Sequence, residues 1–282
     1  MSVFEAILLG IIQGLSEFLP ISSTGHVTVA GKLLNLISSE HPERWTAFIA
    51  VIQLGTMFSV LIYFAKDLFL IVRDFLRDNF HSRKKFSLQS LNSRLGWLVI
   101  VGTIPVVVIG LLFKNSIEGT LTKNLYVISF SLIGLAIILA IAEKIANFKK
   151  NMGNITVKDS IIIGIAQAFA LIPGSSRSGT TITGGLFLGL KRDVAARFSF
   201  LLSIPAVLAS GLFELIHSLD YLTADMALNI IIATLVSGIS GYLAIDFLIK
   251  FLKKHSTFVF IYYRIAIGLF ILILLLTNSI KP

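Results

Sequence analysis

Long apolar stretches, each able to cross a lipid bilayer, dominate this sequence of 282 residues. A membrane-spanning helix needs about 20 mostly apolar residues, because each residue rises about 1.5 Å and the hydrocarbon core is about 30 Å thick. Only 14% of the residues are charged and 55% are hydrophobic, which argues against a soluble domain, a nucleic-acid-binding protein and a disordered chain. Six stretches are long enough to span: 45–65, 95–113, 125–142, 194–216, 227–249 and 258–277.

Two further apolar stretches, 3–37 and 159–190, are interrupted near their middles. The interruptions read LPISSTGH at 19–26 and IPGSSRSGTT at 172–181. Proline, glycine and consecutive serines break a helix, and bare backbone cannot face lipid. We therefore predict two re-entrant helix–loop–helix hairpins, each of which returns to the side of the membrane that it entered.

The connections between the predicted spans are alternately rich and poor in lysine and arginine, so these residues gather on one side of the membrane. Seven lie in 66–94, four in 143–158, three in 191–197 and three in 250–254, whereas the connections on the other side carry few. Cytoplasmic connections are enriched in these residues. We therefore interpret the net charge of +9 as membrane topology, with 66–94 and 143–158 as basic cytoplasmic loops and both termini outside.

The two halves of the chain also resemble each other. GIIQ at 10–13 matches GIAQ at 164–167, and PISS at 20–23 matches PGSS at 173–176. Each half contains one hairpin and three spans, and an odd number of spans inverts the second half relative to the first.

The predicted fold is an all-α polytopic membrane protein in which 1–282 form a single membrane domain. It comprises six transmembrane helices and two re-entrant hairpins, arranged as two inverted-topology repeats at 1–142 and 159–278. The chain has no cysteine, so disulfides and thiolate chemistry are excluded.

Three ionisable side chains lie beside the interruptions. Glu17 and His26 flank the first, and Arg177 lies in the middle of the second. An ionisable group inside a membrane costs about 2.5–3.5 kcal/mol on insertion scales, so such groups indicate a functional site.

The second interruption has the composition of a phosphate-binding loop. Glycines permit close backbone approach, and Arg177 offers a planar, permanently charged fork suited to phosphate. A helix that begins at about Thr181 would direct its N-terminal N–H groups towards an anion. A packing site for small residues is the alternative, but it does not explain the arginine. The predicted diphosphate-binding residues are Gly174, Ser175, Ser176, Arg177, Ser178 and Thr181, together with Ser22 from the first interruption.

The first interruption supplies the reactive groups. Ser23 is the predicted nucleophile and needs a base within hydrogen-bond reach, for which His26 is our first choice and Glu17 the second. Direct attack by His26, or by water that it activates, is the alternative mechanism. Glu17 is also the predicted metal ligand, with Gln13 four residues earlier on the same helix face. We expect Gln167 to be a packing or supporting group.

These motifs bear a specific resemblance to a known family. QGLSEFLPISSTGH at 13–26 resembles the acidic motif of the undecaprenyl-diphosphate phosphatase family, the bacitracin-resistance type, and 173–181 resembles its second signature. The similarity continues through 51–55, 103–105 and 198–202, and so covers nearly the whole chain. The family has Glu or Gln at the position of Gln13, and this chain has the amide, which cannot act as a base.

The resemblance implies a multi-pass enzyme of the bacterial inner membrane that hydrolyses undecaprenyl diphosphate to the monophosphate. This reaction recycles the lipid carrier for peptidoglycan synthesis and confers bacitracin resistance. The resemblance also implies a divalent cation, Mg²⁺ or Ca²⁺, and an active site that faces the outer side.

A membrane transporter or lipid flippase is the rival function, because inverted repeats and broken helices also build transporters. A transporter needs an anion cradle but no nucleophile, so the cluster of Glu17, Ser23 and His26 favours an enzyme. The predicted partners are a polyprenyl diphosphate lipid and the membrane, with no nucleic acid. The sequence leaves the oligomeric state open, a homodimer included.

Overall fold

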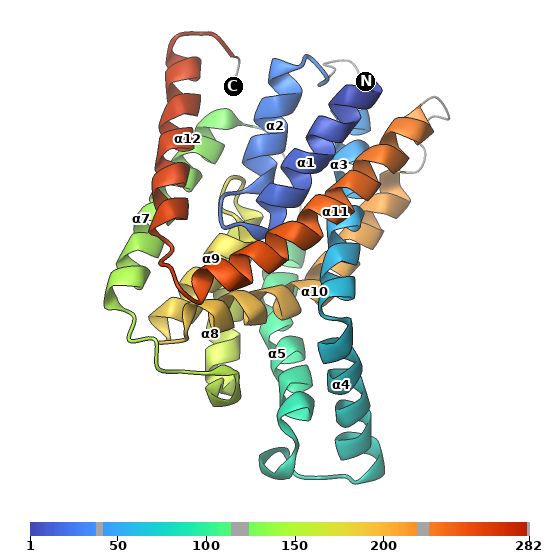
Figure 1. Cartoon of the computed structure of the whole chain (residues 1–282), viewed down its shortest axis with the longest axis vertical. Helices are drawn as coiled ribbons and strands as arrows, with labels where there is room; N and C mark the ends of the chain where they lie inside the picture. The colour runs from blue at the N-terminus through green and yellow to red at the C-terminus, as the bar shows by residue number, and fades with distance from the viewer. Residues whose placement is uncertain (38–41, 114–123, 219–225, 281–282) are drawn as a thin grey trace.

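A computed structural model describes residues 1–37, 42–113, 124–218 and 226–280, and all regular secondary-structure elements within these ranges are helices. One isolated bridge joins Lys150 to Leu190. The α-helices, labelled in Figure 1, are α1 (Val3–Phe18), α2 (Ser23–Leu33), α3 (Pro42–Tyr63), α4 (Ala65–Leu76), α5 (Leu91–Leu112), α7 (Leu125–Ile145), α8 (Val157–Ala168), α9 (Arg177–Phe187), α10 (Arg192–Ser218), α11 (Ala227–Leu252) and α12 (Phe258–Leu276).

Six helices among the described residues are long and apolar enough to cross a membrane. Each coincides with one predicted span, and the ends differ by a few residues, as is usual for helix boundaries. The predicted all-α fold is therefore confirmed for the described residues, and the six helices support a multi-pass membrane protein. The six segments are Arg44–Tyr63, Leu91–Leu112, Leu125–Ile145, Arg192–Phe213, Ala227–Leu252 and Phe258–Leu276.

The two interrupted stretches each fold as two short helices separated by a break, as predicted. We call 19–22 the first break, between α1 and α2, and 172–176 the second break, between α8 with its following 3₁₀ turn and α9. One boundary was predicted wrongly, because α9 begins at Arg177 and not at about Thr181. The Ser176 hydroxyl accepts the Gly179 N–H at 3.2 Å and so caps the helix earlier.

Both breaks end with the same local geometry. Ser22 and Ser176 have positive φ values of 78° and 68°, and each caps the following helix by accepting the N–H of the residue three positions later. This conformation is uncommon for a residue with a side chain, and strained backbone of this kind concentrates at functional sites. The two serines are separated by the same number of residues as Gln13 and Gln167, so the likeness of the halves extends to the breaks.

Helices from the two halves of the chain interleave. From the first half, α1 and α3 both pack against α11 of the second half, and α5 packs against α8, also of the second half (Figure 1). A Cβ added at Gly14 would collide with α11, and one at Gly164 would collide with the backbone of Gly102 on α5. Such small residues let membrane helices approach closely. The interleaving brings segments that are distant in sequence to the middle of the molecule.

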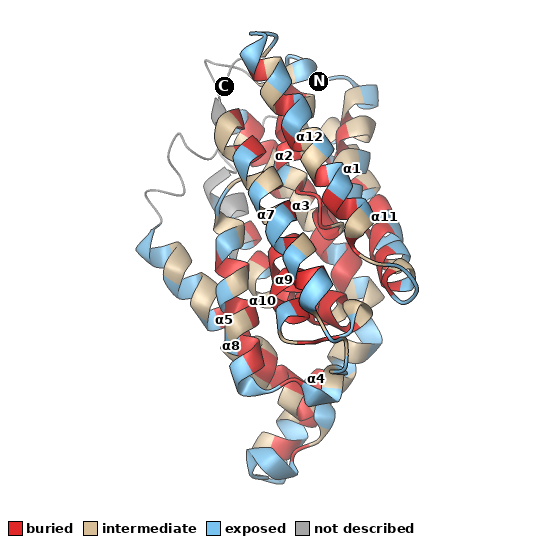
Figure 2. Cartoon of the chain, turned by 90° about the vertical axis from the view of Figure 1, so that its left-hand side faces the viewer, coloured by how far each residue is buried: buried red, intermediate tan, exposed pale blue. Residues whose placement is uncertain are grey.

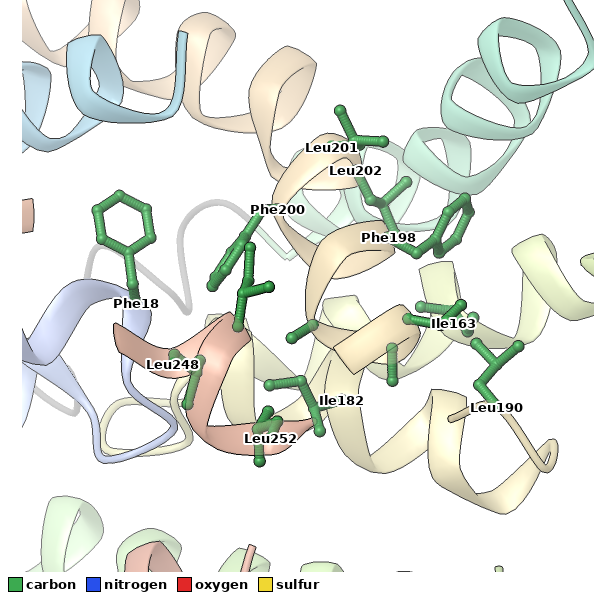
Figure 3. Packing of buried hydrophobic residues seen from close by; sticks show 14 of the residues in the cluster. Phe18, Ile163, Ile182, Leu190, Phe198, Phe200, Leu201, Leu202, Leu248 and Leu252 are labelled. Carbon is green, nitrogen blue, oxygen red and sulfur yellow. The ribbon is translucent and has the colours of Figure 1, made fainter. Parts of the chain in front are cut away.

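The apolar core surrounds the two breaks. Phe18, at the end of α1, meets Phe200 of α10 edge to face with ring centroids 5.4 Å apart, and Ile182 of α9 and Leu248 of α11 belong to the same cluster (Figure 3). Buried residues concentrate in the middle of the assembly, while the outward faces of the long helices are exposed (Figure 2). The core therefore holds the ends of both breaks in place.

The basic segment 66–94 is largely helical, since it contains α4 and the start of α5. Between them the Asp78 carboxylate accepts the Ser90 N–H at 2.8 Å and pairs with Lys84 at 3.0 Å and Arg77 at 3.2 Å. The hydrogen bond from the Ser90 backbone and these two cations hold the pKa of Asp78 well below its ordinary value. The connection between α4 and α5, which we call the basic hairpin tip, lies at the opposite end of the molecule from the start of α1 and the end of α12 (Figure 1).

Candidate active site

The two breaks meet through side chains that the sequence analysis singled out. Arg177, the first residue of α9, donates from Nη2 to Oε1 of Glu17 at 2.8 Å. Beside this ion pair, Ser178 donates to the Leu19 carbonyl at 3.1 Å. The predicted reactive segment and the predicted phosphate loop therefore form one site.

Glu17 is the centre of this site and is only 8% exposed. Its Oε2 atom accepts a hydrogen bond from Ser23 Oγ at 2.6 Å and another from Gln13 Nε2 at 3.1 Å, while Oε1 receives Arg177. The four-residue spacing on α1 brings Gln13 to Glu17, as predicted. We call Gln13, Glu17, Ser23 and Arg177 the Glu17 cluster. It places a hydroxyl directly on a buried carboxylate that a guanidinium neutralises.

His26 lies outside this cluster. Its Nδ1 is 2.7 Å from the Ser22 carbonyl, and its Nε2 is 2.8 Å from the Tyr263 hydroxyl of α12, whose ring stacks on the imidazole. Because a carbonyl only accepts, Nδ1 carries a proton, and in the neutral imidazole Nε2 then accepts from the tyrosine. The contact predicted between Ser23 and His26 is not among the hydrogen bonds of either residue, because α2 turns His26 towards α12 and Glu17 takes the place beside Ser23.

A cavity of about 500 Å³ opens beside the Glu17 cluster. Most of its apolar lining comes from α5 and α10, including Val106, Gly110 and Leu111 on the former and Val207 on the latter, and we call this part the apolar wall. Leu171 and Ile172 add apolar lining beside the second break. The polar lining residues, which we call the polar wall, come from the two breaks, the adjoining helices and α3: Glu17, Ser22, Ser23, Thr24, Gln53, Gln167, Ser175, Ser176 and Arg177. A cavity of this kind suits a ligand with a charged end and an apolar chain.

Most of the predicted diphosphate-binding residues line this cavity: Ser22, Gly174, Ser175, Ser176 and Arg177. Gly174 has φ +85°, and a Cβ there would collide with the backbone of Ile128, so the break requires glycine. Within the described residues, Ser175 Oγ and Arg177 Nη1 are buried without a hydrogen-bond partner, which leaves both able to bind an anion.

Ser178 and Thr181 are placed differently and are not lining residues of this cavity. The Ser178 hydroxyl bonds to the first break, and the Thr181 hydroxyl bonds to the Arg177 carbonyl at 2.8 Å and to Ser199. In this structure, both hydroxyls stabilise the break and the start of α9.

Arg264 of α12 is a residue of the site that the sequence analysis missed. It is 1% exposed and donates to backbone carbonyls of both breaks, including Pro20 at 3.3 Å and Ser175 at 3.0 Å, and to Leu132 of α7 at 3.2 Å. It therefore ties both breaks to each other and to α7. The sequence feature that could have revealed it is a lone arginine inside an apolar span, since a charge there costs free energy unless it has such partners.

The donor set for a metal ion is small. The described residues contain no group of three or more histidine, cysteine or acidic side chains that could hold a metal ion. Glu17 is the one acidic side chain that lines the cavity described above. A divalent cation could bind beside Glu17 if substrate phosphates supply most of its oxygen ligands, as is common for Mg²⁺.

Comparisons with known proteins identify the family of this chain. The bacitracin resistance protein BacA family matches residues 6–270. A protein of Syntrophobacter fumaroxidans named undecaprenyl-diphosphatase is 57% identical over 95% of both chains. Proteins with the same name from Chlorobium limicola and Myxococcus xanthus are each 49% identical and cover 99% and 100% of this chain, and 99% and 92% of their own length. This chain belongs to the bacitracin resistance protein BacA family.

Proposed function

We propose that this protein hydrolyses undecaprenyl diphosphate to undecaprenyl phosphate and phosphate, which recycles the lipid carrier for peptidoglycan synthesis and confers bacitracin resistance. The observation that carries the proposal is the Ser23 hydroxyl, held 2.6 Å from a buried carboxylate that pairs with Arg177, at the polar wall of a half-apolar cavity. Relatives of nearly the same length that bear the name undecaprenyl-diphosphatase support it.

The geometry favours Glu17 as the base for Ser23. Ser23 Oγ attacks the distal phosphorus while its proton passes to Glu17, and the bond from that phosphorus to the bridging oxygen breaks, so that undecaprenyl phosphate leaves. Arg177 neutralises charge on the transferred phosphoryl oxygens, which is most of what phosphoryl transfer requires. Arg177 can make this contact through Nη1, which has no partner among the described residues, while Nη2 continues to hold Glu17. Water then hydrolyses the phosphoserine and releases phosphate.

His26 as general acid/base or as direct nucleophile stays a prediction. Its ring would have to leave Tyr263 and the Ser22 carbonyl to reach Ser23 or the substrate. A divalent cation, Mg²⁺ or Ca²⁺, also belongs to the proposal. Glu17 would hold it together with the substrate phosphates, and Gln13 would orient that carboxylate. When bound, the ion supplies charge neutralisation.

A detergent assay separates this function from transport. We expect purified protein to release phosphate and undecaprenyl phosphate in equal amounts from undecaprenyl diphosphate. A transporter or flippase moves its substrate across a membrane without breaking it. In detergent there is no membrane to cross, so such a protein would release neither product.

We further propose that the protein lies in the bacterial inner membrane with its active site facing outside, and that α1–α2 and α8–α9 are re-entrant hairpins of two inverted repeats. The start of α1 and the end of α12 lie at one end of the molecule and the basic hairpin tip at the other (Figure 1). The apolar wall of the cavity comes from the C-terminal half of α5, which runs from the basic end towards the end with the termini. Together with the positive-inside rule, this arrangement supports a cavity that opens to the outer side.

Single cysteines in this cysteine-free chain test the orientation. We expect an impermeant thiol reagent to label Ser279→Cys, which is exposed near the C-terminus, in intact spheroplasts, and to label Lys85→Cys only after permeabilisation. Labelling of Lys85→Cys alone in intact spheroplasts would reverse the assignment. Labelling of both would be inconsistent with six spans between two sealed sides.

We propose that the polyprenyl chain leaves the cavity along the apolar wall formed by α5 and α10. Gly110 forms part of this wall, and a Cβ added there would meet only Leu171, at 3.9 Å. The fold therefore tolerates a larger side chain at this position, whereas a bound lipid chain would collide with it.

Gly110→Leu should raise KM for undecaprenyl diphosphate about tenfold or more, since overpacking of this size costs about 1–3 kcal/mol. Hydrolysis of a short-chain analogue, dimethylallyl diphosphate, should change little. Gly134→Leu is the matched control, because a Cβ on this exposed glycine of α7 meets nothing within 4 Å. Equal losses with both substrates would place Gly110 at the diphosphate instead, and no loss would place the lipid chain elsewhere.

A further inference from the structure

Gln167, near the end of α8, is the most conspicuous polar group that the mechanism above leaves unused. It is 1% exposed and lines the cavity. Neither Nε2 nor Oε1 of its amide has a hydrogen-bond partner among the described residues. A buried amide without a partner costs free energy, so a residue that serves only packing would be better replaced by an apolar side chain.

Comparison with Gln13 explains why this amide is unpaired. The two glutamines occupy equivalent places in the repeated motif, GIIQ and GIAQ. Gln13 is followed four residues later by Glu17, which accepts its Nε2 at 3.1 Å. Gln167 is followed four residues later by Leu171, whose side chain offers no acceptor, and the α-helix has ended by then. The same side chain is thus supported by its own helix in one half and free in the other.

Three unpaired polar groups belong to residues that line the same cavity. Besides the Gln167 amide, they are Arg177 Nη1 and Ser175 Oγ, each buried and without a partner in the described structure. All three can donate a hydrogen bond, and they come from α8, the second break and the start of α9. Unpaired donors on three residues that line one cavity indicate an anionic ligand with several oxygens.

We propose that Gln167 is a substrate-binding residue that donates from Nε2 to a phosphoryl oxygen of the diphosphate, beside Arg177 and Ser175. This inference rests on the proposed function for the identity of the ligand. It revises our sequence expectation that Gln167 serves packing. It also assigns the two equivalent glutamines different tasks, because Gln13 orients Glu17 whereas Gln167 contacts the substrate.

The proposal predicts opposite effects on stability and on activity. Gln167→Leu should lower kcat/KM about tenfold to a hundredfold, the range expected for a lost hydrogen bond to a charged group. The substrate-free variant should melt at the same temperature as the wild type or higher, because it removes an unpaired buried amide. Gln13→Leu is the contrast, since it removes a satisfied hydrogen bond and should lower the melting temperature.

Binding of inorganic pyrophosphate tests the contact between Gln167 and the phosphoryl oxygen independently of catalysis. We expect pyrophosphate to raise the melting temperature of the wild type, and to raise that of Gln167→Leu much less, since stabilisation follows affinity. Gln167→Glu, which replaces the donor by a carboxylate, should bind pyrophosphate worse than Gln167→Leu.

Three other outcomes would contradict the inference, and a fourth would contradict only the proposed function. Full activity and full pyrophosphate stabilisation in Gln167→Leu would exclude the contact. A lower melting temperature of that variant without substrate would make the residue structural. Activity retained by Gln167→Glu but not by Gln167→Leu would mean that the side chain accepts a hydrogen bond or binds a cation. An inactive wild type that still binds pyrophosphate through Gln167 would overturn the proposed function and leave the contact intact.

Discussion

Ser23→Ala should lose nearly all phosphate release, on the order of 10⁴-fold or more, as expected when a nucleophile is removed. Binding of the lipid diphosphate should change little, because Arg177 and the second break remain. The Glu17 carboxylate would still be held by Gln13 and Arg177. The measurement is single-turnover phosphate release at saturating enzyme, together with lipid binding.

Ser203→Ala is the matched control for this prediction. Ser203 is also a buried serine, but its hydroxyl bonds to the Phe200 carbonyl of its own helix at 2.7 Å, so the variant should keep wild-type turnover. The double variant Ser23→Ala/Glu17→Gln should be no slower than Ser23→Ala alone, because groups that act as a unit are not additive. Substantial turnover by Ser23→Ala would contradict the serine mechanism and favour His26 or water as the nucleophile.

Arg177→Lys should lower kcat/KM about 10²- to 10³-fold although the charge is kept, a loss comparable to removal of one donor from an oxyanion site. Arginine can hold Glu17 through Nη2 and a phosphoryl oxygen through Nη1. Lysine is a compact point charge and cannot reproduce this planar, two-pronged geometry. Kinetics on the purified variant, with its melting temperature recorded in parallel, give the measurement.

Arg197→Lys provides the comparison, since Arg197 pairs with Asp67 at 2.7 Å at a more exposed position away from the lining of the cavity. We expect near-native turnover there. Near-native turnover by Arg177→Lys itself would reduce the role of Arg177 to a general positive charge.

The sequence predicted the spans and the breaks well because both follow from local chemistry. Apolar length sets a membrane helix, and Pro20, Pro173 and the adjoining serines end helices wherever the chain then goes. The pairing of Glu17 with Arg177 could be expected only in outline, as two rare charges that need partners inside a membrane.

Other features depend on side-chain directions and on partners from distant helices. Spacing along α2 suggested that His26 meets Ser23, but Tyr263 of α12 holds the ring elsewhere. Arg264 was concealed within an apolar span, and its carbonyl partners come from three separate segments. Gln167 looked like a packing residue because a sequence does not show which polar atoms lack partners.

The central claim is that the meeting point of the two breaks transfers the distal phosphoryl group of a lipid diphosphate. Hydrolysis by purified wild-type protein in water enriched in heavy oxygen tests it most directly, with both products analysed by mass spectrometry. The account predicts one heavy oxygen in the released phosphate and none in the undecaprenyl phosphate. Heavy oxygen in the undecaprenyl phosphate would show attack at the other phosphorus, and the absence of both products would contradict the claim altogether.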